Sequence, residues 1–213
     1  MTGRADVRTT GRRRLPLAER LRQAIHRQAA VQRFREHRYE RFVRALDLEP
    51  TDRILDVGSG RGNALESRNR VNPIVAVDVA DQAGAFASSP NVTFVRADAR
   101  ALPFEDRDFD IAFSNSVIEH VLGADRRLVA AEIARVAERY WVQTPNRWFP
   151  IEPHYMVPLY QFLPRWFRRR YDDRTGNSIE LLGAGELRLL FPDACIERER
   201  FLGLTKSLIA VRR

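Results

Sequence analysis

The residues from Ile54 to Asn63 combine a carboxylate with three glycines in a pattern that can bind a nucleotide-like ligand. A short apolar run leads to Asp56, and glycines follow at positions 58, 60 and 62. Glycine is needed where the backbone takes a positive φ angle, or where a ligand approaches the main chain closely. Free N–H groups at the start of a following helix can then hold a polar or anionic group. The stretch therefore predicts a buried strand that ends in a ligand-binding turn.

A second apolar run, Ile74–Val77, ends in another carboxylate, Asp78. Asp78 follows the first glycine by about 20 residues, the offset at which an acidic side chain takes the ribose hydroxyls of a nucleoside cofactor. A dinucleotide fingerprint, G-x-G-x-x-G, would place a further glycine at position 63, which is Asn63. The spacing therefore argues against a dinucleotide and favours another nucleoside cofactor.

Two more polar motifs follow predicted strands further along the chain. Asp98-Ala99 comes after the strand expected over Asn91–Arg96, and the run Phe109–Val121 forms another strand that ends near Ser114-Asn115. Each motif lies at the carboxyl end of a predicted strand, which is where an open α/β sheet binds its ligands. One such motif alone is weak, but four in this order indicate a single shared site.

These motifs resemble those of the class I S-adenosylmethionine-dependent methyltransferases, particularly the broad small-molecule group related to the ubiquinone-biosynthesis enzymes. The resemblance runs from about Ile54 to Pro145 and implies S-adenosylmethionine as the cofactor. It implies ten cofactor contacts: Asp56, Gly58, Ser59 and Gly60 at the methionine portion, Asp78 and Val79 at the ribose and adenine, Asp98 and Ala99 at the adenine, and Ser114 and Asn115 beneath the sulfonium. The alternatives are a strand-end cap for Asp78 and a helix or turn cap for Asp98.

Two histidines are candidate catalytic residues. Methyl transfer is an in-line displacement, so a base is needed only if the acceptor carries a proton of high pKa. His154 ranks first as base or acceptor ligand, because the resemblance implies an acceptor pocket after the fifth strand. His120 ranks second, with a capping or packing role as the favoured alternative. Glu119 and His120 are too few neighbouring ligands to predict a metal site.

Other methyl-transfer chemistries lack their residues in this sequence. Ser114–Val117 stand where an Asn/Asp-Pro-Pro-aromatic tetrad would act on the exocyclic amines of nucleic-acid bases. Cys195 lies outside the strand ends expected for cytosine methylation by a cysteine nucleophile. This single cysteine also predicts a reducing compartment. With no apolar signal region and no apolar run of transmembrane length, we expect a cytoplasmic protein.

Strands that alternate with helical patterns predict βαβ units and a parallel sheet with both faces covered. With the resemblance, this gives a doubly wound, seven-stranded, mostly parallel sheet of the Rossmann-like methyltransferase fold, preceded by a helical arm. Strands are expected over residues 53–57, 73–78, 91–96, 109–114 and 140–144, helices over 63–69, 125–138 and 183–190, and a closing hairpin about Gly203.

The first 50 residues differ from the rest of the chain. They hold thirteen arginines against six acidic residues, although the net charge of the whole chain is only +8. Residues 1–14 offer almost nothing to bury, and apolar residues from Leu15 to Leu48 recur at helical spacing, as in one interrupted or two consecutive amphipathic helices. We therefore expect a basic disordered tail with a helical arm over 1–50, and a cofactor-binding methyltransferase domain over 51–213. A packed helix with a solvated face is favoured over a lid or an anionic-surface contact.

The segment 148–176 is expected to be an aromatic substrate cap. Residues 148–171 hold eight of the twenty aromatic residues of the chain, together with four prolines that forbid one long helix. An aromatic cap suits a small acceptor that is apolar or linked to a lipid or glycan, and it is compatible with peripheral membrane contact. The same aromatics could instead form a second small core or a dimer contact.

Two other functions compete with small-molecule methylation. An RNA or protein methyltransferase guided by the basic arm would bind nucleic acid with an affinity that falls steeply with salt, and this alternative is not favoured. The other alternative is a non-enzymatic cofactor-binding or scaffold protein, and the intact glycines together with both carboxylates, Asp78 and Asp98, argue against it.

Overall fold

The structure is a computed structural model that describes residues 17–62, 65–150, 159, 162–164, 166–167 and 179–213, with side chains from residue 32 onward. It divides into two compact units, Met1–Arg38 and Tyr39–Arg213. Its principal elements are α1 (Leu17–Leu46), β1 (Ile54–Val57), β2 (Ile74–Asp78), the 3₁₀ helix η1 (Ala83–Phe86), β3 (Val92–Arg96), β4 (Phe109–Asn115), the 3₁₀ helix η2 (Ile118–His120), α2 (Asp125–Val136), β5 (Ala137–Pro145), α4 (Ala184–Leu190), β6 (Cys195–Phe201) and β7 (Leu204–Arg212).

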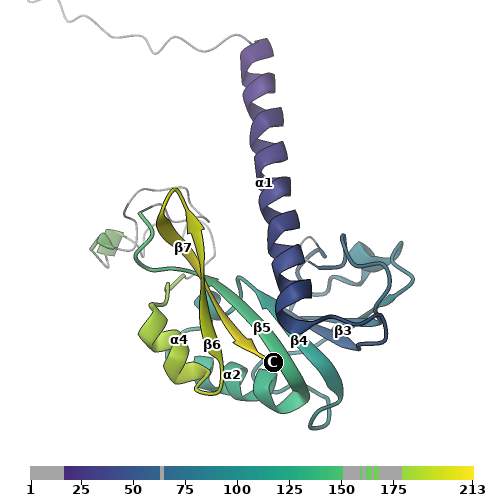
Figure 1. Ribbon diagram of the computed structural model, residues 1–213. Coiled ribbons are helices and arrows are strands. Elements are labelled where there is room, and N and C mark those ends of the chain that lie inside the picture. The colour runs from purple at the N-terminus through teal and green to yellow at the C-terminus, as the bar shows by residue number, and fades with distance from the viewer. Residues whose placement is uncertain (1–16, 63–64, 151–158, 160–161, 165, 168–178) are drawn as a thin grey trace, which may run out of the picture. The chain divides into compact units, whose positions relative to one another are not determined.

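The seven strands of the described chain form one sheet in the order β3-β2-β1-β4-β5-β7-β6 (Figure 1). Strands β1 to β5 pair in parallel, and β7 runs antiparallel to both β5 and β6. The predicted mostly parallel sheet and the hairpin about Gly203 are therefore confirmed. The strand order reverses between β1 and β4, and an open sheet of this kind binds ligands at that switch point.

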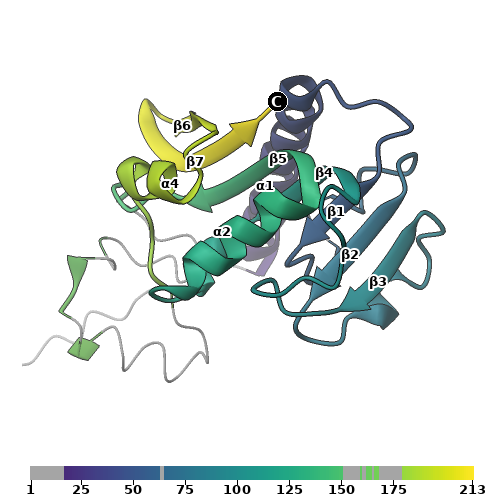
Figure 2. The same cartoon turned by 90° about the horizontal axis from the view of Figure 1, so that it is seen from below.

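Apolar side chains pack on both faces of the central strands. In β5, Tyr140 and Val142 pack against the core that includes α2 and α4, while Trp141 belongs to the core on the other face. That second core includes Phe42 of α1, whose ring meets the Trp141 ring edge-on at 6.0 Å between centroids. Helix α2 can be followed along its face of the sheet in Figure 2. The burial of both faces explains why the strands read as nearly continuous apolar runs.

A single helix, α1, runs through the segment for which the sequence allowed one interrupted or two helices. Its last turns belong to the second unit, because Phe42 and Leu46 are buried in the core of that unit. Arg139 of β5 donates hydrogen bonds of 2.6 Å to the Leu46 carbonyl and to the Asp52 carboxylate. These bonds tie the end of the helix to the sheet. Within the described residues, none of the helices combines the length and apolar character that crossing a membrane requires.

The prediction of a helix over 63–69 is wrong for the described residues, because residues 65–68 form turns. The Asn69 side chain accepts hydrogen bonds from the backbone N–H groups of Val71 and Asn72, at 3.1 and 3.0 Å. An asparagine that bonds to the backbone in this way competes with helix formation and favours a turn.

The helix expected over 125–138 ends at Val136, and β5 begins at the next residue, earlier than predicted. Arg212 of β7 donates hydrogen bonds to the backbone carbonyls of Ala134 and Glu138, at 3.0 and 2.9 Å. This side chain satisfies a carbonyl that the end of a helix leaves unpaired, and it holds the following residues at the sheet.

Candidate functional site

The turn after β1 contains glycines with two different surroundings. Gly58 has a φ angle of +73°, and a Cβ there would lie 2.4 Å from Cγ2 of Val117. Its N–H donates a hydrogen bond of 2.8 Å to the carbonyl of Val77 on β2. Gly60 has a φ angle of +54°, but a Cβ there would meet no atom within 4 Å. Gly58 therefore closes the turn against the protein, whereas Gly60 borders open space that a ligand can enter.

Asp78 ties the end of β2 to this turn. Its Oδ2 accepts a hydrogen bond of 3.0 Å from the Gly60 N–H, and its Oδ1 accepts one of 2.9 Å from the Ala80 N–H. The carboxylate thus forms the strand-end cap that the sequence left open as an alternative. Asp78 also lines the pocket described next, so capping does not remove it from the site.

A pocket of about 600 Å³ lies at the carboxyl ends of the parallel strands, a size typical of small-molecule sites. The structure brings six predicted residues together in its wall: Gly58, Asp78, Val79, Asp98, Ala99 and His120. Residues that sequence reasoning missed also line it, including Arg100, Ser116, Val117 and Leu122. Ser116 and Val117 lie within the run Phe109–Val121, and Arg100 and Leu122 lie directly beside a predicted motif, so position along the chain is the signal that could identify them.

The other predicted residues are placed differently. Among the described residues that line the pocket, five predicted cofactor contacts do not occur: Asp56, Ser59, Gly60, Ser114 and Asn115. Asp56 and Ser114 are buried within β1 and β4, and Ser59 is buried in the turn that follows β1. His154 lies outside the described residues.

The carboxylate of Asp98 is held by Arg100. The Arg100 guanidinium donates hydrogen bonds of 2.6 to 3.0 Å to both Asp98 oxygens, and one of 2.6 Å to Asp125. These side-chain hydrogen bonds keep the pKa of Asp98 below its usual value. The Arg100 backbone N–H also donates a hydrogen bond of 2.9 Å to Asp98. This bond makes Asp98 a turn cap, the role that the sequence analysis gave as the alternative to adenine binding. Asp98 is thus a charged acceptor in the pocket wall at neutral pH.

Two carboxyl groups are buried together beneath the glycine turn. Asp56 is 1% exposed and Glu66 is 2% exposed. Oδ2 of Asp56, both carboxyl oxygens of Glu66 and Oγ of Ser59 have no hydrogen-bond partner among the described residues. Burial first, and then the neighbouring Glu66, raise the pKa of Asp56 well above its usual value. The raised pKa favours a protonated Asp56 carboxyl, whose O–H can donate to Glu66 within this buried pair. Glu66 lies in none of the sequence motifs, and its place beside Asp56 is visible only in the structure.

Replacement of Glu66 by glutamine is expected to raise Tm at pH 8 by about 2–4 °C, with a difference that shrinks toward pH 4.5. The pKa of Asp56 is raised from its unfolded value of 3.8. The contribution of Asp56 to the free energy of unfolding is therefore fully present below about pH 4, and it is lost as the pH rises through the pKa of Asp56 in the folded protein. Glutamine at position 66 removes the like charge beside Asp56, so the free energy of unfolding falls less at high pH than in the wild type. Thermal unfolding between pH 4.5 and 8 measures this, with the exposed Glu138→Gln as a control. Identical profiles for Glu66→Gln and the wild type would contradict it.

The Glu-His pair after β4 is split between the core and the pocket. Glu119 is fully buried, and its carboxylate accepts a hydrogen bond of 2.9 Å from the Thr144 hydroxyl on β5. His120 is exposed and lines the pocket. The turn η2 therefore anchors itself through one residue and presents the next to a ligand.

Known proteins resemble this chain in sequence and in structure. Residues 55–139 match the model of a family described as a methyltransferase domain. Malonyl-[acyl-carrier protein] O-methyltransferase of Marinomonas sp. (strain MWYL1) is 35% identical over 114 residues, which cover 50% of this chain and 42% of the relative. The chain thus spans about two fifths of the length of that relative.

Two further proteins match most of the chain. The ubiquinone/menaquinone biosynthesis C-methyltransferase UbiE of Xylella fastidiosa (strain 9a5c) is 28% identical over 197 residues, which cover 80% of this chain and 76% of the relative. The crystal structure of an S-adenosylmethionine-dependent methyltransferase from Mesorhizobium loti shares the fold, with a TM-score of 0.59 and 19% identity over 79% of this chain and 96% of that one. Residues 55–139 therefore match a methyltransferase domain, and the comparisons support a class I S-adenosylmethionine-dependent methyltransferase with S-adenosylmethionine as its cofactor.

Proposed function

We propose that the chain transfers a methyl group from S-adenosylmethionine to a small acceptor that is apolar or linked to a lipid or glycan. The observation that carries this acceptor class is a group of exposed aromatic side chains in the segment 148–176. Trp148 is 67% exposed and Trp166 is 71% exposed, and the Trp148 ring lies 5.7 Å from that of Phe162. Large apolar groups gathered at the surface are typical of a binding surface for an apolar partner. In this proposal the segment 148–176 is a substrate cap on the domain over 51–213, and residues 1–50 form an arm.

The name of one relative supports an apolar acceptor, whereas the name of the other gives an acyl group carried on a protein. One is named for a malonyl group on an acyl carrier protein, and the other for the biosynthesis of ubiquinone and menaquinone. Neither name refers to a nucleic acid. The single cysteine further supports a cytoplasmic location, which we include in the proposal.

The proposal gives each predicted residue a task toward the cofactor. S-adenosylmethionine supplies the methyl group and the sulfur leaving group. Its parts would be held by three groups of residues: Asp56, Gly58, Ser59, Gly60 and Glu66 at the methionine end, Asp78 and Val79 at the ribose and adenine, and Asp98 and Ala99 at the adenine. Ser114 and Asn115 would lie beneath the reacting centre and help to position the acceptor.

Two histidines are proposed as bases for an acceptor with a hydroxyl group. His154 ranks first because it lies in the proposed cap. His120 is the candidate that the described pocket supports, since its side chain lines the wall beside Val121. A neutral imidazole can take the proton of an alcohol or phenol as its oxygen attacks the methyl carbon.

Transfer of a labelled methyl group to a panel of acceptors tests the acceptor class. The panel should contain a quinone-like phenol, a polyprenyl-phosphate-linked sugar, a malonyl thioester, bulk tRNA and a mixed peptide library. We expect label in at least one small acceptor and none in RNA or peptides. His154→Ala is expected to slow that transfer while leaving S-adenosylmethionine affinity unchanged.

The basic arm provides the discriminating variant. Truncation should end at Arg38, because Phe42 and Leu46 lie in the core of the second unit. We expect the truncated protein to methylate the small acceptor at the rate of the full chain. Label in tRNA that falls steeply with salt and disappears on truncation would overturn the proposed acceptor class in favour of an RNA methyltransferase.

A further inference from the structure

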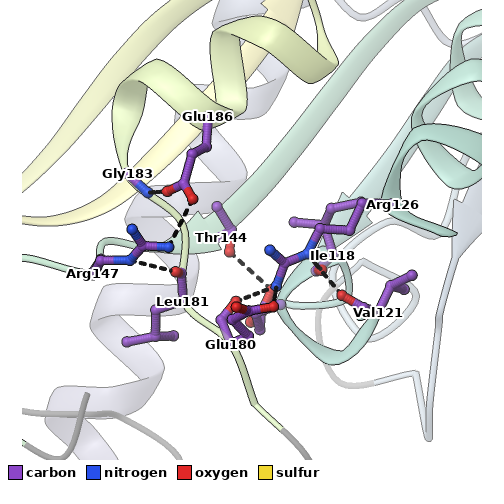
Figure 3. Close-up of polar contacts among 10 residues, drawn as sticks. Ile118, Val121, Arg126, Thr144, Arg147, Glu180, Leu181, Gly183 and Glu186 are labelled. Carbon is purple, nitrogen blue, oxygen red and sulfur yellow. Dashed lines mark hydrogen bonds and ion pairs between the residues drawn. The ribbon is translucent and has the colours of Figure 1, made fainter. Parts of the chain in front are cut away.

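One buried arginine joins two segments that lie far apart in the sequence. Arg126 lies in the first turn of α2 (Figure 3). Its exposed fraction is 8%. Its Nε donates hydrogen bonds to the backbone carbonyls of Ile118 and Val121, at 3.2 and 2.7 Å. Its Nη2 donates to the backbone carbonyl of Glu180 and lies 3.5 Å from the Glu180 carboxylate. The guanidinium is therefore used mainly to hold main-chain atoms.

The first of these segments carries a wall of the pocket. The carbonyls of Ile118 and Val121 flank the short turn that contains His120, and both His120 and Val121 line the pocket. The same turn is held from the other side, since the Glu180 N–H donates a hydrogen bond of 2.9 Å to the Glu119 carbonyl. Movement at Arg126 would therefore move the part of the wall that presents His120.

The second segment is where the chain returns from the proposed cap. The guanidinium of Arg147, just before the cap, donates hydrogen bonds to the Leu181 carbonyl and the Glu186 carboxylate (Figure 3), at 2.9 and 2.8 Å. The backbone N–H of Arg147 donates to the Leu182 carbonyl at 3.0 Å. The described residues on either side of the proposed cap, Arg147 and Leu181, thus lie side by side. Arg126 connects this junction to the turn of His120.

The chemistry of this contact requires arginine. A planar guanidinium presents several N–H donors in a fixed fork, whereas a lysine ammonium is a compact charge on a flexible stem. Burial lowers the pKa of the Arg126 guanidinium, and the Glu180 carboxylate opposes that effect. Removal of the guanidinium would leave the carbonyls of Ile118, Val121 and Glu180 without this donor.

We propose that Arg126 is a positioning residue that fixes His120 and the adjoining pocket wall relative to the end of the proposed cap. The role of the cap in binding the acceptor rests on the proposed function, whereas the positioning of His120 does not depend on it. A role that is only structural would lower stability without a specific effect on His120. The two roles can therefore be separated by comparison with an arginine elsewhere on the same helix.

Arg135 provides that matched control. It lies in the last turn of α2 and also holds main chain, with hydrogen bonds of 2.8 and 3.2 Å to the carbonyls of Phe104 and Leu102. It forms ion pairs with Glu132 and Asp106. Arg135 is not among the described residues that line the pocket.

The experiment compares Arg126→Gln and Arg126→Lys with Arg135→Gln in the full-length protein. The chain has only four histidines, so the imidazole Cε1–Hε1 signal of His120 can be assigned by NMR with a His120→Gln variant. We expect both Arg126 variants to move this signal and its pH titration, and to weaken S-adenosylmethionine binding by about tenfold. Arg135→Gln should lower Tm without either change. An unchanged His120 signal in the Arg126 variants, or an equal change in Arg135→Gln, would overturn the proposal.

A second variant covers the case in which Arg126→Gln and Arg126→Lys do not fold. Thr144→Val keeps the shape of a buried side chain but removes the hydroxyl that donates to Glu119. We expect it to move the His120 signal in the same direction, because it loosens the same turn. An unmoved signal in this variant would contradict the proposal. The NMR comparison is made on the free protein, so a failure of the wild type to bind S-adenosylmethionine would refute the proposed function alone.

Discussion

Replacement of Asp78 by alanine is expected to weaken S-adenosylmethionine binding by about 100-fold or more. In the proposed site the carboxylate accepts hydrogen bonds from both ribose hydroxyls, and a hydrogen bond to a charged group contributes about 1.5–3 kcal/mol. Two such bonds correspond to at least about two orders of magnitude in Kd. Isothermal titration calorimetry measures the change directly.

The effect must be separated from damage to the glycine turn, because Asp78 also accepts the N–H of Gly60. Asp78→Asn keeps an acceptor for that N–H but removes the charge, and it should fall between wild type and alanine. Asp81→Ala is the control, since Asp81 is an exposed acid whose carboxylate accepts a hydrogen bond from the nearby Ala83 N–H. Wild-type affinity in a folded Asp78→Ala protein would show that Asp78 does not hold the ribose.

Alanine at Gly58 is expected to destabilise the fold, whereas alanine at Gly60 is expected to block the cofactor. At Gly58 a Cβ would clash with Val117 at 2.4 Å, in addition to the strain of a positive φ angle. Overpacking and strain together cost about 2–4 kcal/mol, which lowers Tm by roughly 5–15 °C. At Gly60 only the strain applies, so Tm should fall by about 2–4 °C.

For cofactor binding, we expect alanine at Gly60 to have the larger effect of the two variants. The Cβ at Gly60 would enter the open space of the turn, and we expect S-adenosylmethionine affinity to fall by at least about tenfold. Thermal unfolding and calorimetry on the same two variants give both quantities. A Gly60→Ala protein with wild-type affinity would indicate that the cofactor does not use this space. A Gly58→Ala protein with wild-type Tm would indicate that Val117 can move aside.

Much of the sheet could be predicted because its signals are local. The apolar runs that end at Val57, Asp78 and Ser114 are strands in the structure, and the polar residues that follow them meet around one pocket. Strand ends of a parallel sheet share an edge, so a motif at each end is enough to predict where the site lies. Arg126 and Glu66 could not be predicted in this way.

The roles of Arg126 and Glu66 come from contacts with residues that no local sequence pattern indicates. Arg126 holds the carbonyl of Glu180, which lies 54 residues further along the chain. Glu66 lies in the segment 63–69, where the sequence predicts a helix. The structure instead has a turn at Asn69 and places Glu66 beside the buried Asp56. Long-range hydrogen bonds and buried like charges leave no periodic pattern, so only a structure shows them.

The identity of the cofactor is tested by a calorimetric titration of S-adenosylmethionine into the wild-type protein, with NAD⁺ titrated separately. We expect saturable binding of one S-adenosylmethionine per chain and no heat from NAD⁺, because Asn63 breaks the dinucleotide pattern of glycines. Binding of NAD⁺, or no binding of S-adenosylmethionine by the folded protein, would show that the glycine turn does not serve S-adenosylmethionine.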